Sequence, residues 1–208
     1  MIRKIKLIRK LKYYFFKLGI HQIVPRKMLV FLGHLSSLSE WISNTNDIKF
    51  TSFPSKKFNY DKRYDLYQFI IKNEILNIEI DYFEFGVSKG HSFKWWVKNI
   101  HNKNSRFYGF DTFTGLPEDW GPFKKGDMSN GNKPPNINDP RCKFYQGIFQ
   151  YTLYNFLKSY KIGKKKVILM DADLYSSTLF VLTTLSPYLK KGDIILFDEF
   201  NVPLHEYK

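Results

Sequence analysis

Cysteine is nearly absent from this sequence, because Cys142 is the only cysteine among 208 residues. A lone cysteine forms no internal disulfide and has no second thiolate with which to hold a zinc ion. The sequence is therefore unlike that of a disulfide-stabilised secreted domain. We expect the protein in a reducing compartment, with the cytoplasm as the default location.

Long apolar runs are also missing. A membrane-spanning helix needs about 18 or more consecutive apolar residues, and no such run occurs. Apolar residues do gather near the N-terminus, but Lys and Arg interrupt them before the continuous core of a signal peptide develops. We therefore expect neither a spanning helix nor a signal peptide.

Acidic residues are missing from one segment. Residues 1–28 hold nine Lys and Arg and no Asp or Glu, so only +5 of the formal charge of +14 belongs to the other 180 residues. Apolar residues recur there at steps of three and four, which predicts an amphipathic basic helix. They are Ile2, Ile5, Ile8, Leu11, Phe15 and Leu18. This stripe is compatible with a membrane surface, and at least as well with packing on the domain or on a second subunit of a homo-oligomer.

The sequence has ample material for a packed core. Hydrophobic residues make up 43% and aromatic residues 18% of the chain, which argues against disorder. The length suffices for one ordinary domain with an extension, and not for two domains. We place the extension, a basic helix and a connecting segment, at residues 1–60 and the domain at residues 61–208.

Within residues 61–208, segments typical of strands alternate with segments typical of helices. Strands are expected at residues 78–87, 105–111, 142–147, 165–171 and 192–200, and helices at residues 61–77, 92–100, 151–160 and 177–189. This alternation predicts right-handed crossovers and a parallel sheet covered by helices on both faces. The expected fold class is therefore α/β. A further short helix is expected at residues 28–42.

A long segment rich in Gly, Pro and Asn, residues 112–141, separates the second and third expected strands. A loop of this length inside a compact domain is usually a lid or a binding loop.

Two glycines and an acid indicate a ligand site at the first strand. Gly86 and Gly90 lie in the turn "EFGVSKGHS", where they allow a tight turn and the close approach of a ligand to a helix N-terminus. The turn differs from the G-x-G-x-x-G of dinucleotide enzymes and is a weak signal by itself. Asp111 ends the second strand 25 residues after Gly86, close to the spacing of an acid that binds ribose hydroxyls. Together they favour a nucleoside-containing ligand.

Further acids follow the last two expected strands. Asp171 and Asp173 come after the fourth strand, and Asp198 and Glu199 come at the end of the fifth. Because parallel strands end at one edge of the sheet, we expect Asp171, Asp198 and Glu199 to converge there. Clustered carboxylates repel one another unless a cation lies between them, and oxygen ligands suit Mg²⁺. The alternative is that Asp173 caps a helix and Glu199 is solvated.

Several segments, in this order, resemble the macrocin O-methyltransferase type of S-adenosylmethionine-dependent methyltransferases. They are "DYFEFGVSKGHSFKWW", "GFDTFTGLPEDW", "GIFQYTL", "MDADLYSST" and "LKKGDIILFDEF", and the resemblance covers roughly residues 61–208. It implies a Rossmann-like methyltransferase fold. It also implies that Glu84, Gly86 and Ser92 lie near the methionine part of the cofactor, that Asp111 holds the ribose, and that "TFTGLPEDW" belongs to a mobile loop.

The resemblance further implies that Asp171, Asp198 and Glu199 bind magnesium, with Asp171 the better ligand of the two acids in "DAD". Glu199 stands where an Asp is expected in such enzymes. The fold also normally adds two strands after the fifth, so we expect either a poorly stable monomer or an edge that another chain or the N-terminal segment covers.

The expected activity is methyl transfer from S-adenosylmethionine to a hydroxyl of a small, sugar-like or polyol acceptor, with Asp171 as candidate general base and His205 as a weaker one. A basic RNA-binding methyltransferase is disfavoured, because the charge excess lies in the N-terminal segment and no stacking platform or basic-aromatic motif occurs elsewhere. A catalytically inactive methyltransferase-fold fragment is the remaining alternative.

Overall fold

The computed structural model of the chain describes residues 2–45, 49–50 and 59–198. The chain divides into two compact units, Met1–Phe53 and Pro54–Lys208.

Within residues 2–45, the first unit contains the helices α1 (Ile2–Lys17), α2 (Ile20–Ile23) and α3 (Arg26–Asn44). Gly19 separates α1 from α2 with a φ of 60°, a left-handed conformation that glycine adopts at little cost. The basic helix predicted in residues 1–28 is confirmed as α1, and the short helix predicted at residues 28–42 is the longer α3. In the part of the chain that the structure describes, no helix is long and apolar enough to cross a membrane.

The second unit is built on a parallel sheet. Its strands are β1 (Ile80–Phe85), β2 (Arg106–Asp111), β3 (Cys142–Gln146), β4 (Lys165–Met170) and β5 (Ile194–Phe197). Their order is β3-β2-β1-β4-β5, and every neighbouring pair is parallel. The order reverses between β1 and β4, and ligands bind at such a reversal in open α/β sheets. The predicted Rossmann-like α/β fold is confirmed.

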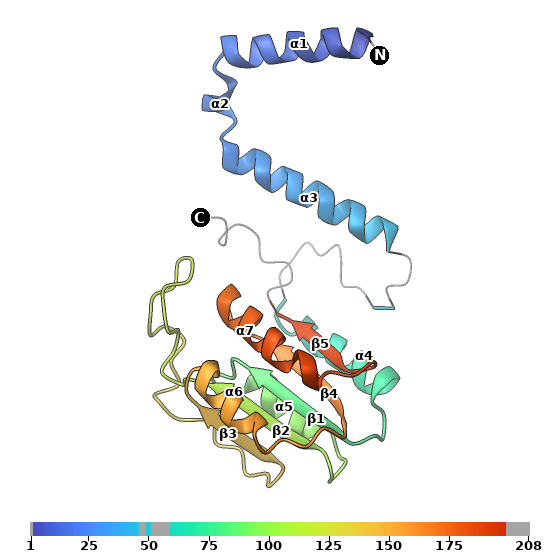
Figure 1. The fold of residues 1–208 in the computed structure, drawn as a ribbon, viewed down its shortest axis with the longest axis vertical. Helices are drawn as coiled ribbons and strands as arrows, with labels where there is room; N and C mark the ends of the chain where they lie inside the picture. Colours follow the sequence, from blue (N-terminus) through green and yellow to red (C-terminus); the bar gives the residue numbers. More distant parts are fainter. Residues whose placement is uncertain (1, 46–48, 51–58, 199–208) are drawn as a thin grey trace. The chain divides into compact units, whose positions relative to one another are not determined.

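Helices cover both faces of this sheet. They are α4 (Lys62–Glu74), α5 (His91–Asn99), α6 (Phe149–Leu157) and α7 (Tyr175–Leu185), the last continued by a 3₁₀ turn, Ser186–Tyr188. In Figure 1, α6 and α7 lie in front of the sheet and α5 lies behind it. Each predicted element of the domain exists, with ends that differ from the predicted ones by a few residues.

Side-chain alternation along β1 explains why both faces are covered. Tyr82 is fully buried in the apolar cluster that α4 and α5 make with the sheet. Its neighbours Phe83 and Phe85 are fully buried in the cluster on the α6 and α7 side. Because successive side chains of a strand point to opposite faces, large apolar residues at consecutive positions require a layer of helix on each side.

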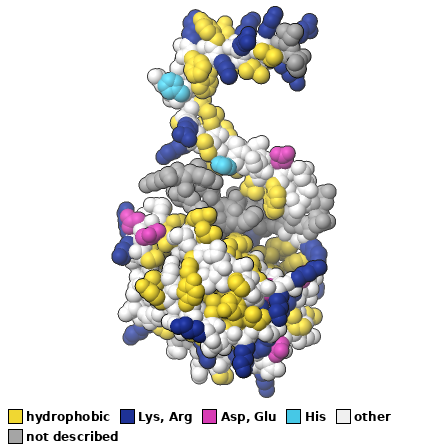
Figure 2. Space-filling view, in the orientation of Figure 1, with side chains coloured by type: hydrophobic (Ala, Val, Ile, Leu, Met, Phe, Trp, Pro, Cys, Tyr) yellow, Lys and Arg dark blue, Asp and Glu magenta, His cyan; other side chains and the backbone are white. Residues whose placement is uncertain are grey.

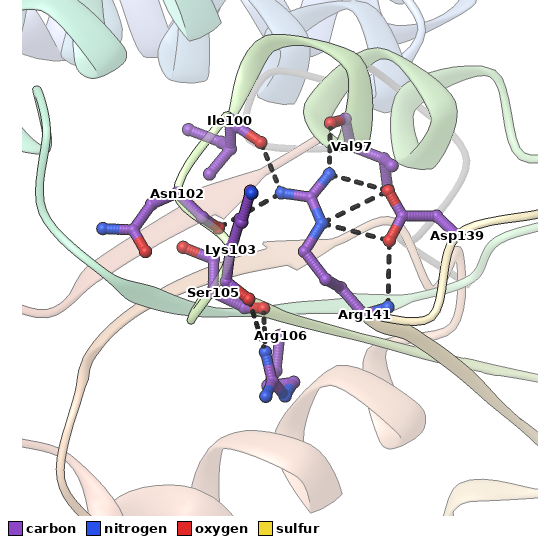
Figure 3. A network of polar contacts seen from close by, with 8 residues as sticks. All are labelled: Val97, Ile100, Asn102, Lys103, Ser105, Arg106, Asp139 and Arg141. Atoms are coloured by element: carbon purple, nitrogen blue, oxygen red, sulfur yellow. Dashed lines mark hydrogen bonds and ion pairs between the residues drawn. The ribbon is translucent and has the colours of Figure 1, made fainter.

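Arg141 anchors the end of the long loop between β2 and β3 (Figure 3). Its guanidinium donates hydrogen bonds to the carbonyl oxygens of Val97 at 3.0 Å and Ile100 at 2.5 Å, at the C-terminal end of α5. The same group pairs with Asp139, with 2.8 Å between Nη2 and Oδ2. The last carbonyls of a helix lack partners within the helix, so Arg141 satisfies them and fixes the loop to α5.

Strand β5 is one edge of the sheet that residues 59–198 form. The expectation of an uncovered or partner-covered edge depends on the chain after Asp198, and residues 199–208 lie outside the described residues.

Candidate active site

A cavity of about 720 Å³ lies at the carboxyl ends of the strands. Segments that follow β1, β2, β4 and β5 line it, together with the long loop and the start of α4. The polar and glycine residues of its lining include Tyr60, Arg63, Glu84, Gly86, Ser92, Asp111, Asp171, Asp173 and Asp198. The volume falls within the usual range for a small-molecule site, on the order of 300 to 1,000 Å³.

The glycine turn after β1 has a steric reason. A Cβ on Gly86 would lie 1.7 Å from the carbonyl oxygen of Asp171, and Gly86 has a φ of 93°. A side chain at this position is therefore excluded by the neighbouring backbone after β4. Gly90 begins α5 in a left-handed conformation, where a Cβ would lie 2.7 Å from Pro135 Cγ. Gly86 lines the cavity, whereas the structure does not place Gly90 on it.

Asp111 holds the turn in place. Its Oδ2 accepts hydrogen bonds from the backbone N–H groups of Val87 and Ser88, each at 2.7 Å. Its Oδ1 accepts a third from the N–H of Phe113, at 2.6 Å. Both carboxylate oxygens therefore already organise the cavity wall. Asp111 does face the cavity, as predicted. It also holds the backbone of the turn, which its distance from Gly86 in the sequence did not indicate.

Glu84 is a buried acid at the cavity, with 1% of its surface exposed. The hydroxyl of Tyr82 donates a hydrogen bond to Glu84 Oε2. Burial raises the pKa of Glu84 well above its usual range. An apolar surrounding disfavours the ionised carboxylate unless a cation approaches, so a cationic group of a ligand in the cavity would find a matching partner here.

Arg63 is the residue that the sequence analysis missed. From the first turn of α4, its Nη2 reaches Asp198 Oδ1 at 2.8 Å, and its Nη1 lies 3.6 Å from Asp171 Oδ2. Nη1 also donates a hydrogen bond to Ser92 Oγ at 3.2 Å. The guanidinium therefore joins the acids after β4 and β5 to the start of α5.

Aromatic stacking completes the environment of Arg63. Its guanidinium carbon lies 3.3 Å from the centroid of the Tyr60 ring, and the Arg63 side chain is only 11% exposed. The feature of the sequence that points to Arg63 is the cluster of acids after β4 and β5. Converging acids need a cation, and an arginine in the helix before β1 can supply that charge as well as the metal ion that the sequence predicted.

Two acids that follow β4, Asp171 and Asp173, have raised pKa values. Burial raises the pKa of the Asp171 carboxyl to about 7; the charge of Asp198 acts in the same direction and Arg63 opposes both. Burial and then the charge of Asp198 raise the pKa of Asp173 to about 6. An acid of this strength exchanges protons readily at neutral pH, which suits a general base.

The acids predicted as metal ligands are brought together only in part. Asp171 and Asp198 line the same cavity and share Arg63, whereas Glu199 and the weaker candidate His205 lie outside the described residues. Among residues 2–45, 49–50 and 59–198, no group of three or more His, Cys, Asp or Glu side chains is arranged to hold a metal ion.

The alternative role of Asp173, as a cap of the helix after β4, does not hold in the structure. Leu174 is the N-cap residue of α7, and no side chain caps that end. Asp173 instead has a φ of 56° and lines the cavity. A left-handed conformation is uncommon for residues other than glycine, although Asp tolerates it better than most. Asp173 therefore faces the site rather than the helix.

The long loop after β2 supplies the apolar wall of the cavity. Leu116, Trp120 and Phe123 line it, and the rings of Trp120 and Phe123 stack with centroids 5.5 Å apart. Backbone hydrogen bonds join Leu116 to the far side of the loop, at Gly126 and Asp127. The predicted position of "TFTGLPEDW" beside the site is therefore confirmed, while its mobility stays a prediction.

Comparison with solved structures shows where this fold occurs. The crystal structure of the calicheamicin methyltransferase CalS11 is similar, with a TM-score of 0.56 and 20% identity over 86% of this chain and 80% of that chain. The apo structure of CalS11, described as a TDP-rhamnose 3'-O-methyltransferase of calicheamicin biosynthesis, gives a TM-score of 0.50 and 22% identity over 81% of this chain and 77% of that one. At such identities the likeness shows the fold alone.

Comparison with known sequences supplies the family. Curated proteins gave no match. The family described as "Methyltransferase domain" matches residues 83–200, which is more than half of the chain. The match begins within β1 and runs through the turn, the long loop and the acids after β4 that form the cavity. The chain therefore belongs to this methyltransferase family and is an S-adenosylmethionine-dependent methyltransferase.

Proposed function

We propose that the protein transfers the methyl group of S-adenosylmethionine to a hydroxyl of a small, sugar-like acceptor. The observation that supports the proposal most directly is the position of Asp171. Its carboxyl lies where the strand order reverses between β1 and β4, with Arg63 beside it, and its pKa is about 7. A hydroxyl acceptor must lose a proton when its oxygen is methylated, so O-methyl transfer calls for a base at this place.

The residues of the cavity fit S-adenosylmethionine. Glu84 is a buried acid that matches the positive ammonium group of the methionine part, and Ser92 offers a hydroxyl to the same cavity. Leu116 and Phe149 give the cavity apolar surface on which an adenine ring can pack. When bound, the cofactor supplies a methyl group on a sulfonium, which an oxygen nucleophile attacks.

The chain's own residues then have separable tasks. Asp171 accepts the hydroxyl proton, and Arg63 holds the carboxyl groups of Asp171 and Asp198 in place through ion pairs. The long loop brings Trp120 and Phe123 to the cavity, and we expect these rings to exclude water when the reactants are bound. Alignment of two bound reactants accounts for much of the rate enhancement in group transfers of this kind.

The class of acceptor rests on the polar part of the cavity. Gln150, Ser176 and Ser177 line it near the starts of α6 and α7, and amide and hydroxyl groups are suited to a ligand with several hydroxyls. The similar protein described as a TDP-rhamnose 3'-O-methyltransferase points to the same class. A nucleotide-activated sugar is therefore the first acceptor to offer.

Magnesium, which the resemblance implied, does not fit the described residues. The guanidinium of Arg63 already lies 2.8 Å from Asp198 Oδ1 and 3.6 Å from Asp171 Oδ2, so the charge that a metal was expected to neutralise has a partner. We therefore expect turnover to persist in excess chelator. Loss of turnover on chelation, restored by added Mg²⁺, would contradict this expectation.

The proposal is tested with labelled cofactor. The full chain is incubated with S-adenosylmethionine that carries a labelled methyl group, and with nucleotide sugars, free glycans and RNA in separate reactions. We expect one labelled methyl group on a sugar, seen by mass spectrometry. Asp171→Asn should lose this transfer while still binding S-adenosylhomocysteine. Labelling of RNA alone, or full transfer by Asp171→Asn, would contradict the proposal.

A further inference from the structure

The helices of the first unit expose apolar side chains to an unusual degree. In α1 and the residue that follows it, Ile5, Leu7, Ile8, Leu11, Phe16 and Leu18 are between 44% and 77% exposed. Neither α2 nor α3 contains a buried residue. Single exposed apolar residues are common on soluble proteins, but contiguous apolar surface marks an interaction site.

The same helix is strongly cationic. α1 contains seven Lys and Arg and no acid, and the first acid of the chain is Glu40. Figure 2 shows dark blue basic side chains interspersed with yellow hydrophobic ones along this part of the chain. No Lys or Arg of α1 therefore has an acidic residue of the same helix three or four positions away, the spacing at which ion pairs form along a helix.

Many of the apolar and basic side chains of α1 occupy different arcs of the helix. With 3.6 residues per turn, Leu7, Ile8, Leu11 and Phe15 fall within an arc of about 100°. Arg3, Lys6, Lys10 and Lys17 fall within a separate arc of about 60°. Of the remaining cations of α1, Lys4 falls inside the apolar arc, and Arg9 and Lys12 fall outside both arcs. Their long stems allow the charged ends to reach water or phosphate from an apolar surface.

We propose that α1 binds the surface of an anionic lipid bilayer, with its apolar arc among the headgroups and its basic arc against lipid phosphates. A helix with an apolar face, basic flanks and no acid is suited to this position. Each basic residue near such a surface contributes attraction that salt weakens. A nucleic acid would use the cations and leave the apolar arc in water, and a second copy of α1 would bring like charges together.

The experiment is flotation of the full chain with phosphatidylcholine vesicles, with and without phosphatidylglycerol. We expect the protein to float with the anionic vesicles only, and added salt to release it. Leu7→Ser with Leu11→Ser keeps the charge and removes apolar surface, and should weaken binding by about tenfold or more per leucine. Lys6→Gln with Lys10→Gln should weaken it by about fivefold per lysine.

Two controls make the result specific. Lys94→Gln with Lys98→Gln removes the same charge from exposed positions of α5 and should leave flotation unchanged. Cofactor binding should be equal in all these variants, because the substituted side chains line no part of the cavity. Absence of flotation with anionic vesicles would overturn the proposal, as would unaltered binding by the leucine variant. Tighter binding of the chain to an oligonucleotide, or self-association that the leucine variant abolishes, would assign α1 to those partners instead.

Discussion

At the scale of single residues, the cavity is organised by one arginine shared between acids of two strand ends. Arg63 contacts Asp171, Asp198 and the hydroxyl of Ser92, and its face stacks on Tyr60. Removing one partner of a buried charge network leaves the others without compensation, which costs more than the net contribution of the interaction.

Replacing Arg63 therefore tests the network. Arg63→Met keeps most of the apolar stem and removes the charge, so Asp171 and Asp198 lose their cation. We expect the free energy of unfolding to fall by about 2 to 4 kcal/mol in denaturant titrations, together with a large loss of turnover. Lys72→Met, at an exposed position of the same helix, should change the free energy of unfolding by less than about 0.5 kcal/mol. Equal stabilities for the two variants would contradict the role of Arg63.

The pKa of Asp171 sets the pH dependence of turnover. Because burial and Asp198 raise this pKa to about 7, the base is protonated and inactive in acid. We expect kcat/KM to rise about tenfold per pH unit below pH 7 and to level off above it. Arg63, Glu84 and Asp173 also face this carboxyl, so Asp171→Asn is the informative comparison, and its residual rate should lack this dependence.

The raised pKa of Asp171 also makes the free energy of unfolding depend on pH. The folded-state pKa of Asp171 lies above the value of an unfolded chain, so the folded state binds the proton more tightly. Its contribution to stability is present below about pH 4 and is lost as the pH rises towards 7. The unfolding midpoint of Asp171→Asn should therefore gain relative to that of the wild type as the pH rises across this window. A constant difference would show that the pKa of Asp171 is not raised.

At the scale of elements, the close approach of the chain after β1 to the chain after β4 explains the glycine of the turn. Gly86→Ala would place a Cβ 1.7 Å from a carbonyl oxygen, at a φ of 93°. We expect a loss of about 3 kcal/mol or more in the free energy of unfolding. Gly163→Ala is the matched control, because a Cβ there has no atom within 4 Å. If both variants unfold at the same denaturant concentration, the described approach is wrong.

The elements themselves were predictable because their patterns are local. Alternation of buried strands with amphipathic helices indicated β1 to β5 and α4 to α7, and helical connections between successive strands indicated a parallel sheet. The strand order itself was not predicted. The partners of side chains were less predictable. The spacing of Asp111 indicated a ribose ligand, whereas three backbone N–H groups bind its carboxylate in the structure. Arg63 lies over 100 residues from Asp171 in the sequence, and no local pattern joins them.

At the scale of the whole molecule, function depends on the reversal of strand order between β1 and β4. The turn after β1 and the acids after β4 and β5 meet there, and the long loop adds an apolar wall. A compact catalytic unit and a basic helical unit share the chain. The central claim is that this cavity holds the methyl donor.

Hydrogen–deuterium exchange of the full chain, with and without saturating S-adenosylhomocysteine, tests that claim most directly. Backbone amides near a bound ligand exchange more slowly, because the ligand stabilises the folded state and makes local opening less frequent. We expect added protection in residues 86–92 and 112–128, and unchanged exchange in residues 2–44. Unchanged exchange in the turn and the long loop, or protection confined to other segments, would contradict the assignment of this cavity to the cofactor.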